Sequence, residues 1–152
     1  MHRAVTGMEE TIREMQRLGQ ESGDAAKAML QAGAEKVKAA WRAAIMARDL
    51  VKTGEMLGSV GYRAPKDAGT GMYVEIYPQG VDSRGLRNAE KAFINHYGTT
   101  THPATRFVDD AEKMGEAMAV PAMEAIWDEF IESGQVPRVP KTPNHPGGVS
   151  KK

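Results

Sequence analysis

Cysteine is absent from this sequence of 152 residues. Disulfide bonds, thiolate nucleophiles and thiolate metal ligands are therefore excluded, and the composition suits folding in a reducing cytoplasm. Aromatic residues are also scarce, at 6% of the chain, so a core must be built mainly from Ala, Val, Ile and the ten Met. No apolar run approaches the roughly 20 residues that are needed to span a bilayer.

Net charge is a further absence, because 20 Lys and Arg residues are offset by 20 Asp and Glu residues. A neutral chain produces no long-range field that would attract nucleic acid or an anionic membrane. Residues 1–6 lack the apolar segment of a secretory signal, so we expect a soluble, unexported protein without membrane contact. The length is that of one compact domain.

Helical periodicity dominates the first third of the chain. Thr6 and Glu9 have the spacing of a capping box, which predicts a helix that begins at Thr6 and ends near Gly19. Residues 22–24 continue this break, and a longer helix is predicted from there to about Arg48. The first helix carries an apolar stripe formed by Met8, Ile12, Met15 and Leu18. The second is rich in Ala, so another element can approach its backbone closely.

Strand composition appears in the middle of the chain. Thr53 is expected to cap a short turn, after which residues 59–62 alternate as a strand should. Residues 72–77 have the strongest β composition and should pair antiparallel with them across a loop at 64–71. A polar surface loop is predicted at 78–88. Both loops could order against neighbouring subunits or remain plain solvent-exposed linkers.

The last part of the chain is predicted to be helical and then irregular. Residues 89–97 favour a short helix that ends at Gly98, with a strand as the alternative for so short a stretch. A long helix is expected at 105–133, ending at Gly134. The predicted fold is therefore α+β, with a small antiparallel sheet packed with a long N-terminal-half helix and a long C-terminal helix. A single domain should cover residues 1–134, followed by a Pro- and Gly-rich flexible tail at 135–152.

Two segments resemble a family of tailed-phage proteins known as tail-component, neck or tail-completion proteins. Residues 47–60 resemble the family stretch Ala-Pro-Val-Asp-Thr-Gly-x-Leu-x-x-Ser-Ile, with Thr53, Gly54 and Ser59 matching as they stand. Residues 93–111 resemble Glu-Phe-Gly-Thr followed by Pro-Ala-x-Pro-Phe-Leu-x-Pro-Ala. The residues that match there are Gly98, Thr99, Pro103, Ala104, Phe107 and Ala111.

The resemblance implies a non-enzymatic virion protein that joins or completes the tail at the head-to-tail interface of a long-tailed bacteriophage. It would be assembled in the bacterial host cytoplasm and act through oligomeric contacts in the neck or tail. The implied partners are other copies of the chain in a ring, the portal or connector, and the tail-terminator and tail-tube proteins, with DNA passing through the channel without sequence-specific binding. The candidate structural or interaction residues are Thr53, Gly54, Ser59, Tyr97, Gly98, Thr99, Pro103 and Phe107.

These candidates also have purely structural interpretations. Phe107 would be ordinary core, and Gly98 with Thr99 would form a sharp turn or, alternatively, a partner contact. Four basic residues of the predicted helix 24–48 could touch DNA in a neck channel, although the neutral total favours a solvated face. They are Lys36, Lys38, Arg42 and Arg48.

Histidines near the predicted turn raise the question of metal binding or acid-base chemistry. His96 and His102 flank it, and Asp109 and Asp110 follow closely. Their spacing matches no established ligand motif and no nucleophile is paired with a base, so we predict no catalytic residue, no metal and no cofactor. Two alternatives to the phage protein stay open: a host adaptor that binds another protein, and a small metal-dependent hydrolase.

Overall fold

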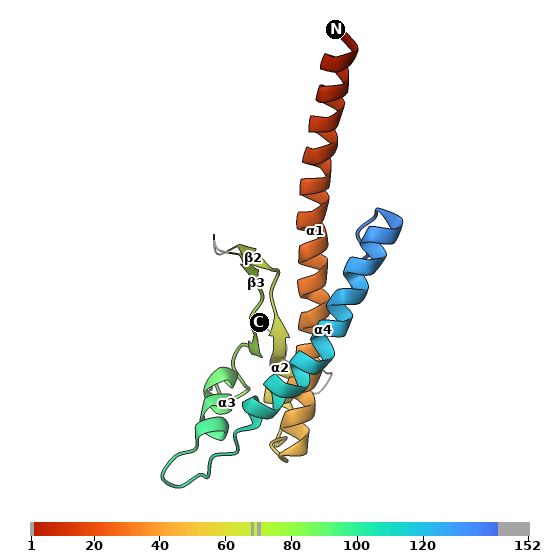
Figure 1. Ribbon diagram of the computed structural model, residues 1–152. Coiled ribbons are helices and arrows are strands. Elements are labelled where there is room, and N and C mark those ends of the chain that lie inside the picture. Colours follow the sequence, from red (N-terminus) through yellow and green to blue (C-terminus); the bar gives the residue numbers. More distant parts are fainter. Residues whose placement is uncertain (1, 68, 70, 143–152) are drawn as a thin grey trace.

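The computed structural model of the chain describes residues 2–67, 69 and 71–142. Its elements, in chain order, are α1 (His2–Ala47), α2 (Glu55–Ser59), β1 (Val60–Tyr62), β2 (Lys66–Asp67), β3 (Met72–Tyr73), β4 (Ile76–Pro78), α3 (Asn88–Tyr97) and α4 (Phe107–Ser133). Figure 1 shows α4 crossing α1, with the strands running beside α1. The predicted α+β class, with two long helices and small antiparallel sheets, is confirmed.

α1 is one continuous helix, whereas the sequence predicted two. The helix is already present at His2, so Thr6 lies inside it and is not its N-cap. Neither Gly19 nor the cluster at 22–24 interrupts the helix. The predicted start and the predicted break were both wrong.

Local interactions explain why α1 passes through its glycines. Arg17 forms an ion pair with Glu21 at 2.7 Å, which spans one turn across Gly19. The Ser22 hydroxyl donates a hydrogen bond to the carbonyl oxygen of Gly19 at 3.0 Å. A glycine inside a helix costs only about 1 kcal/mol relative to alanine, so a few favourable neighbours are enough to keep the helix intact.

The first part of α1 extends away from the rest of the fold. The described side chains at 10–13 and 16–20 are all exposed, and the first buried one in the described part of the chain is Ala25. Figure 1 shows this segment projecting alone. Residues 8–24 carry the predicted apolar stripe, of which Ile12 and Leu18 are 51% and 48% exposed. We call this segment the α1 stem.

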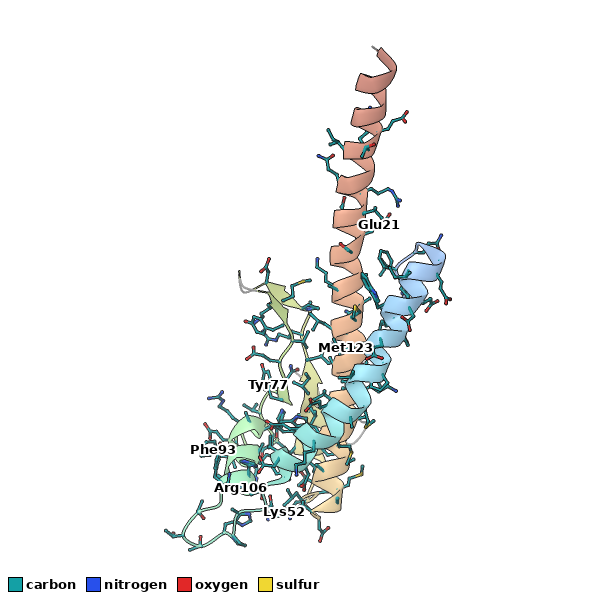
Figure 2. The ribbon with its side chains drawn as sticks, viewed as in Figure 1. Glu21, Lys52, Tyr77, Phe93, Arg106 and Met123 are labelled. Atoms are coloured by element: carbon teal, nitrogen blue, oxygen red, sulfur yellow. The ribbon has the colours of Figure 1, made fainter. Side chains whose placement is uncertain are left out.

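The remainder of α1 packs closely against α4. A Cβ atom on Gly33 would lie 2.9 Å from the sulfur of Met123, which Figure 2 shows on α4 where the two helices cross. A Cβ atom on Gly115 would lie 3.2 Å from Val37 Cγ2. Small residues on both helices therefore let the two backbones approach, as the Ala-rich sequence predicted.

The predicted antiparallel pair is present, in two parts. β1 pairs with β4 in the register Val60 with Pro78 and Tyr62 with Ile76. Farther along the same hairpin, β2 pairs with β3. The predicted strand at 72–77 is thus divided into β3 and β4, and the predicted loop at 64–71 contains β2.

The core lies where α1, α2, β1, α3 and α4 meet. Phe107, at the start of α4, is completely buried, and its ring meets that of Trp41 edge to face at 5.7 Å. Ile45 and Val60 are also fully buried. The other buried core members are Ala44, Met56, Leu57, Ala92 and Ala111. Among the described residues, no helix combines the length and apolar character that crossing a membrane requires.

Candidate interaction surface

α3 lies between two grooves, and this arrangement makes it the centre of the candidate surface. On one side, Lys91, Ile94 and Asn95 face the first groove. On the opposite side, Phe93 and Tyr97 face the second. Three apolar side chains of α3 are well exposed: Phe93 at 64%, Tyr97 at 54% and Ile94 at 43%. Exposed apolar groups gathered beside concave surfaces are typical of protein interaction sites.

The first groove, here called the α2–α3 groove, is apolar at its centre and basic at its edge. Its apolar lining comes from the segment between α1 and α2, from α2, from the loop before α3 and from α3: Leu50, Val51, Met56, Leu57, Leu86 and Ile94. Its basic residues are Lys52, Arg84 and Lys91. Of the described residues that line it, none is Asp or Glu. The groove therefore suits an amphipathic partner with acidic flanks.

The second groove, here called the aromatic groove, lies between β4, α3 and the start of α4. Its aromatic lining consists of Trp41, Tyr77, Phe93, His96 and Tyr97. The rings of Phe93 and Tyr97 lie 4.7 Å apart, and Figure 2 shows Phe93 on the outer side of α3. The Arg106 guanidinium lies 5.3 Å from the centre of the Tyr97 ring. Asp109 and Glu112 also line this groove, so its charge is mixed.

The turn after α3 is built on Gly98. This residue has φ of 78°, and its N–H donates to the carbonyl oxygen of Ile94 at 2.7 Å, which ends the helix as predicted. A Cβ atom there would lie 2.6 Å from the nitrogen of Ala104 and 2.7 Å from the oxygen of His102. Only glycine fits this position, because both the backbone angle and the close approach exclude a side chain.

Asparagine and threonine side chains fasten the same turn to α3. The carbonyl oxygen of Asn95 accepts hydrogen bonds from Thr105, through the backbone N–H at 2.9 Å and the hydroxyl at 2.7 Å. The Asn95 side-chain oxygen lies 2.9 Å from His102 Nε2. The wall of the α2–α3 groove is therefore a fixed turn held by several hydrogen bonds.

The loop before α3 is held by a buried carboxylate, although the sequence predicted a plain surface loop there. The Asp82 carboxylate accepts hydrogen bonds from the N–H groups of Arg84 and Leu86, both at 2.9 Å, and from Lys91 Nζ at 3.0 Å. Burial alone would raise the pKa of Asp82, but the Leu86, Lys91 and Arg84 donors outweigh it and lower the pKa to about 2. The prediction missed this organisation because a hydrophilic loop sequence does not reveal that a carboxylate turns inward.

A second polar cluster joins α1, β1 and the segment after α4. Lys38 is 1% exposed, and its ammonium donates to the Thr142 carbonyl oxygen at 2.5 Å. The Tyr62 hydroxyl donates to the Glu35 carboxylate, and Lys141 Nζ donates to the Tyr62 carbonyl oxygen at 3.0 Å. Burial lowers the pKa of Lys38, while burial and the hydrogen bond to Glu35 raise the pKa of Tyr62.

This cluster corrects the predicted basic face of the long helix. Lys38 is buried and Arg42 is half-buried, while Arg48 is paired with Asp110 at 2.8 Å. A continuous solvated basic surface is therefore not formed by these residues. Lys141 and Thr142, from the predicted tail, contact α1 and β1, while residues 143–152 of that tail lie outside the described residues.

The two histidines near the turn have different partners. His96 Nδ1 accepts a hydrogen bond from the N–H of Val108 at 3.3 Å, and its Nε2 lies 3.9 Å from Asp109. His102 contacts Asn95 instead. Within the described part of the chain, no group of three or more His, Cys, Asp or Glu side chains is arranged to hold a metal ion.

The candidate residues from the sequence fall into three places. Thr53, Gly54 and Thr99 come together in the lining of the α2–α3 groove. Tyr97 lines the aromatic groove, and Gly98 and the exposed Pro103 belong to the turn between α3 and α4. Ser59 and Phe107 are buried, the former with its hydroxyl donating to the Met56 carbonyl oxygen at 2.8 Å.

Thr53 and Gly54 shape the groove through the backbone. Gly54, with φ of 84°, is the N-cap of α2, in place of the predicted Thr53. The Thr53 hydroxyl accepts a hydrogen bond from the N–H of Glu55 at 3.3 Å. The Glu55 carboxylate then reaches the loop before α3, accepting from the N–H of Ser83 at 3.1 Å. The sequence motif thereby connects α2 to that loop.

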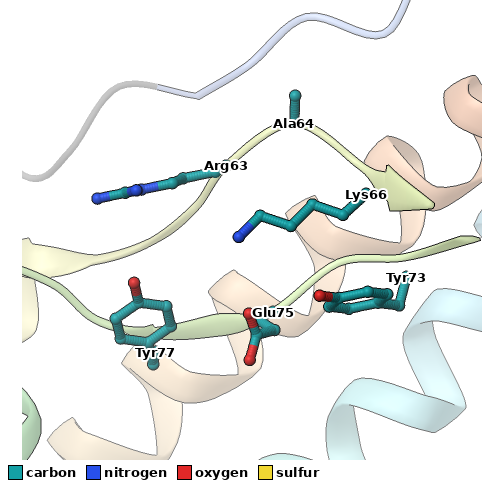
Figure 3. A pocket seen from close by; sticks show the side chains of 6 residues that line it. All are labelled: Arg63, Ala64, Lys66, Tyr73, Glu75 and Tyr77. Carbon is teal, nitrogen blue, oxygen red and sulfur yellow. The ribbon is translucent and has the colours of Figure 1, made fainter. Parts of the chain in front are cut away.

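A smaller pocket lies between the two arms of the hairpin. Figure 3 shows Arg63 and Lys66 of one arm reaching toward Tyr73, Glu75 and Tyr77 of the other. Lys66 lies opposite Tyr73 in the register of β2 and β3, and cross-strand side-chain pairs stabilise a short hairpin. The pocket is much smaller than the grooves beside α3 and is explained by the pairing of the two arms.

Comparison with known proteins gives one family. Residues 9–82 match the family model described as "HK97-gp10_like: Bacteriophage HK97-gp10, putative tail-component". The matched region contains most of α1, α2 and the entire hairpin, and ends at Asp82. Neither the search of curated proteins nor the search of solved structures returned a match.

Proposed function

The chain belongs to the HK97-gp10-like phage tail-component family through residues 9–82, and on this basis we propose that it joins or completes the tail at the head-to-tail interface of a long-tailed bacteriophage. It works as a structural subunit, through contacts with other proteins. The observation that carries this proposal is the pair of grooves on either side of α3, with Phe93, Ile94 and Tyr97 exposed between them.

The physical character of α3 supports a docking role. Burial of an exposed aromatic side chain in an interface contributes about 1.5–3 kcal/mol, and aromatic residues are over-represented at the centres of protein interfaces. The rings of Phe93 and Tyr97 already contact each other, so less conformational entropy is lost when a partner covers them. The partners we propose are other copies of the chain in a ring and the adjoining portal, connector, tail-terminator or tail-tube subunits.

Assembly of virus particles tests the proposal. The gene is deleted from the producing phage, and particles are examined by electron microscopy and by infectious titre after complementation in trans. We expect deletion to leave heads and tails unjoined or tails abnormal, and wild-type protein to restore joined particles. Normal tails and full infectivity without the protein would overturn the proposal.

A paired substitution links this assay to α3. Phe93→Asp with Tyr97→Asp should leave the fold intact, since both side chains are exposed, but should fail to restore joined particles. The matched control is Val120→Asp, because Val120 is 47% exposed on α4 and lies away from both grooves. Complementation by the control and not by the paired variant is the expected result.

A further inference from the structure

We propose that the α1 stem of one copy docks as a helix in the α2–α3 groove of a second copy of this chain. The contact is heterologous, because it joins two different surfaces of the two copies. The inference rests on the proposed function, because it names a second copy as the occupant of one of the grooves beside α3. Its parts are the stem, whose described side chains at 10–13 and 16–20 are exposed, and the groove, which is open to solvent.

The two surfaces match in apolar character. In the stem sequence, Met8, Ile12, Met15 and Leu18 follow one another at helical spacings of four, three and three residues. Amphipathic helices that bind in grooves use anchors at such spacings. The described members Ile12 and Leu18 are each about half exposed. On the other side, the groove exposes Val51, Leu86 and Ile94 at 40%, 48% and 43%.

The two surfaces also match in charge. Residues 8–24 contain five acidic residues and two basic ones, a net charge of −3, although the whole chain is neutral. Arg17 is already paired with Glu21 within the stem. The groove lining contains Lys52, Arg84 and Lys91, and none of its described members is acidic. Asp82, just outside the lining, lies 3.0 Å from Lys91 and 4.0 Å from Arg84, so Lys52 contributes most to the positive charge offered to a partner. The aromatic groove is a poorer match, since Asp109 and Glu112 line it.

The stem cannot reach the groove of its own chain. Figure 2 shows Lys52 near the lower end of the molecule and Glu21 well above it along α1. α1 runs unbroken from His2 to Ala47, and at 1.5 Å per residue the 26 steps from Glu21 to Ala47 span roughly 39 Å. The contact must therefore be made with another copy. Repeated heterologous contacts of this kind close into a ring or continue as a filament.

The test uses the full chain and two complementary variants, followed by sedimentation velocity over a range of concentrations. The stem variant carries Ile12→Asp and Leu18→Asp, and the groove variant carries Lys52→Glu and Ile94→Asp. All four positions are exposed, so both variants should give wild-type circular dichroism. We expect wild-type chains to self-associate, more weakly at high salt, and each variant to associate about tenfold or more weakly.

Mixing the variants gives the sharpest result. The groove variant keeps an intact stem and the stem variant keeps an intact groove, so an equimolar mixture should form a one-to-one dimer and stop there. Val120→Asp and Lys113→Glu, both exposed on α4, serve as controls and should behave like wild type.

Three outcomes would overturn the inference: a wild-type chain that remains monomeric, variants that associate as wild type does, or a mixture without the dimer. None of these would decide the proposed function, which the particle-joining assay tests separately. If the stem variant still self-associates but fails to restore joined particles, the stem contact between copies is contradicted. The proposed function is not.

Discussion

The carboxylate of Asp82 and the ammonium of Lys91 lie 3.0 Å apart, and the Asp82 side chain is only 1% exposed. Lys91 belongs to α3, while Asp82 belongs to the loop that follows the hairpin. The same carboxylate accepts backbone hydrogen bonds from Arg84 and Leu86, so one side chain organises the loop and holds it against α3. Two of these residues, Leu86 and Lys91, line the α2–α3 groove, whose shape therefore depends on an ionised Asp82.

Stability should fall in acid through Asp82. The folded protein holds the pKa of this carboxyl at about 2, below its ordinary value of about 3.9 in an unfolded chain. Its contribution is fully present above about pH 4 and is lost as the pH falls through about 2. We expect the urea midpoint to decrease over this range.

Asp82→Asn provides the control for this measurement. The variant should be less stable than wild type at pH 7 and should lose less stability between pH 4 and pH 2. An acid dependence equal to that of wild type would show that Asp82 is not responsible.

Phe107 and Phe93 form a matched pair of substitutions. Phe107 is completely buried against Trp41, and Phe107→Ala should lower the free energy of unfolding by about 3–5 kcal/mol. Phe93 is 64% exposed, and Phe93→Ala should change it by no more than about 0.5 kcal/mol. Urea denaturation distinguishes these values, and similar losses for both variants would contradict the assignment of core and surface.

Gly98 and Gly85 separate steric clash from backbone strain. Both have φ near 80°, but only Gly98 has atoms within 3 Å of a Cβ position. Gly85→Ala should cost about 1–2 kcal/mol from left-handed strain alone. Gly98→Ala should cost clearly more, since the backbone at residues 102–104 must also move. Equal losses of stability would mean that the turn adapts without cost.

Continuity of α1 can be tested in its stem. Nothing lies within 4 Å of a Cβ atom at Gly19 or Gly23, so alanine there should stabilise the helix by up to about 1 kcal/mol at each position. Hydrogen exchange of residues 10–23 should slow accordingly in the double variant. Unprotected amides at 19–23 in the wild type would instead favour two separate helices.

Gly33→Leu should have the opposite effect within the same helix. Its side chain would meet Met123, and overpacking of this kind costs about 1–3 kcal/mol. The change is measured by urea denaturation, with Gly23→Ala as the control. A neutral Gly33→Leu variant would mean that α1 and α4 are less closely packed than their glycines indicate.

Elements with strong local signals could be predicted from the sequence. Gly98 and Gly134 end α3 and α4 where the pattern placed their ends, and both have positive φ. The hairpin was recognisable from its β-branched and aromatic residues. In each case the element is determined by interactions between residues close together in the chain, which a sequence pattern can reveal.

Features that depend on distant partners could not be predicted in this way. Lys38 is buried because Thr142, 104 residues later, accepts its hydrogen bond. Gly19 looked like a helix end, although the interactions around it favour continuation. Residues 78–88 were predicted only as a polar surface loop, because Lys91, the side-chain partner of Asp82, comes from the next helix.

The candidate surface was predictable in part. Thr53, Gly54 and Thr99 were selected from two separate motifs, and they meet in one groove. The apolar residues Leu86 and Ile94 that complete this groove were not selected, because isolated apolar residues in a loop and a short helix resemble ordinary core. Their exposure, which only the fold determines, is what makes them candidates for interaction.

The 46 residues of α1 have a mechanical consequence. At 1.5 Å per residue the helix is roughly 69 Å long, whereas a compact chain of this size has a radius of gyration of about 15 Å. The contacts with α4 lie in the second half of α1, so the first half extends beyond the packed part of the fold. A small rotation of the packed part of the protein would therefore move the N-terminal end of α1 over a much larger distance.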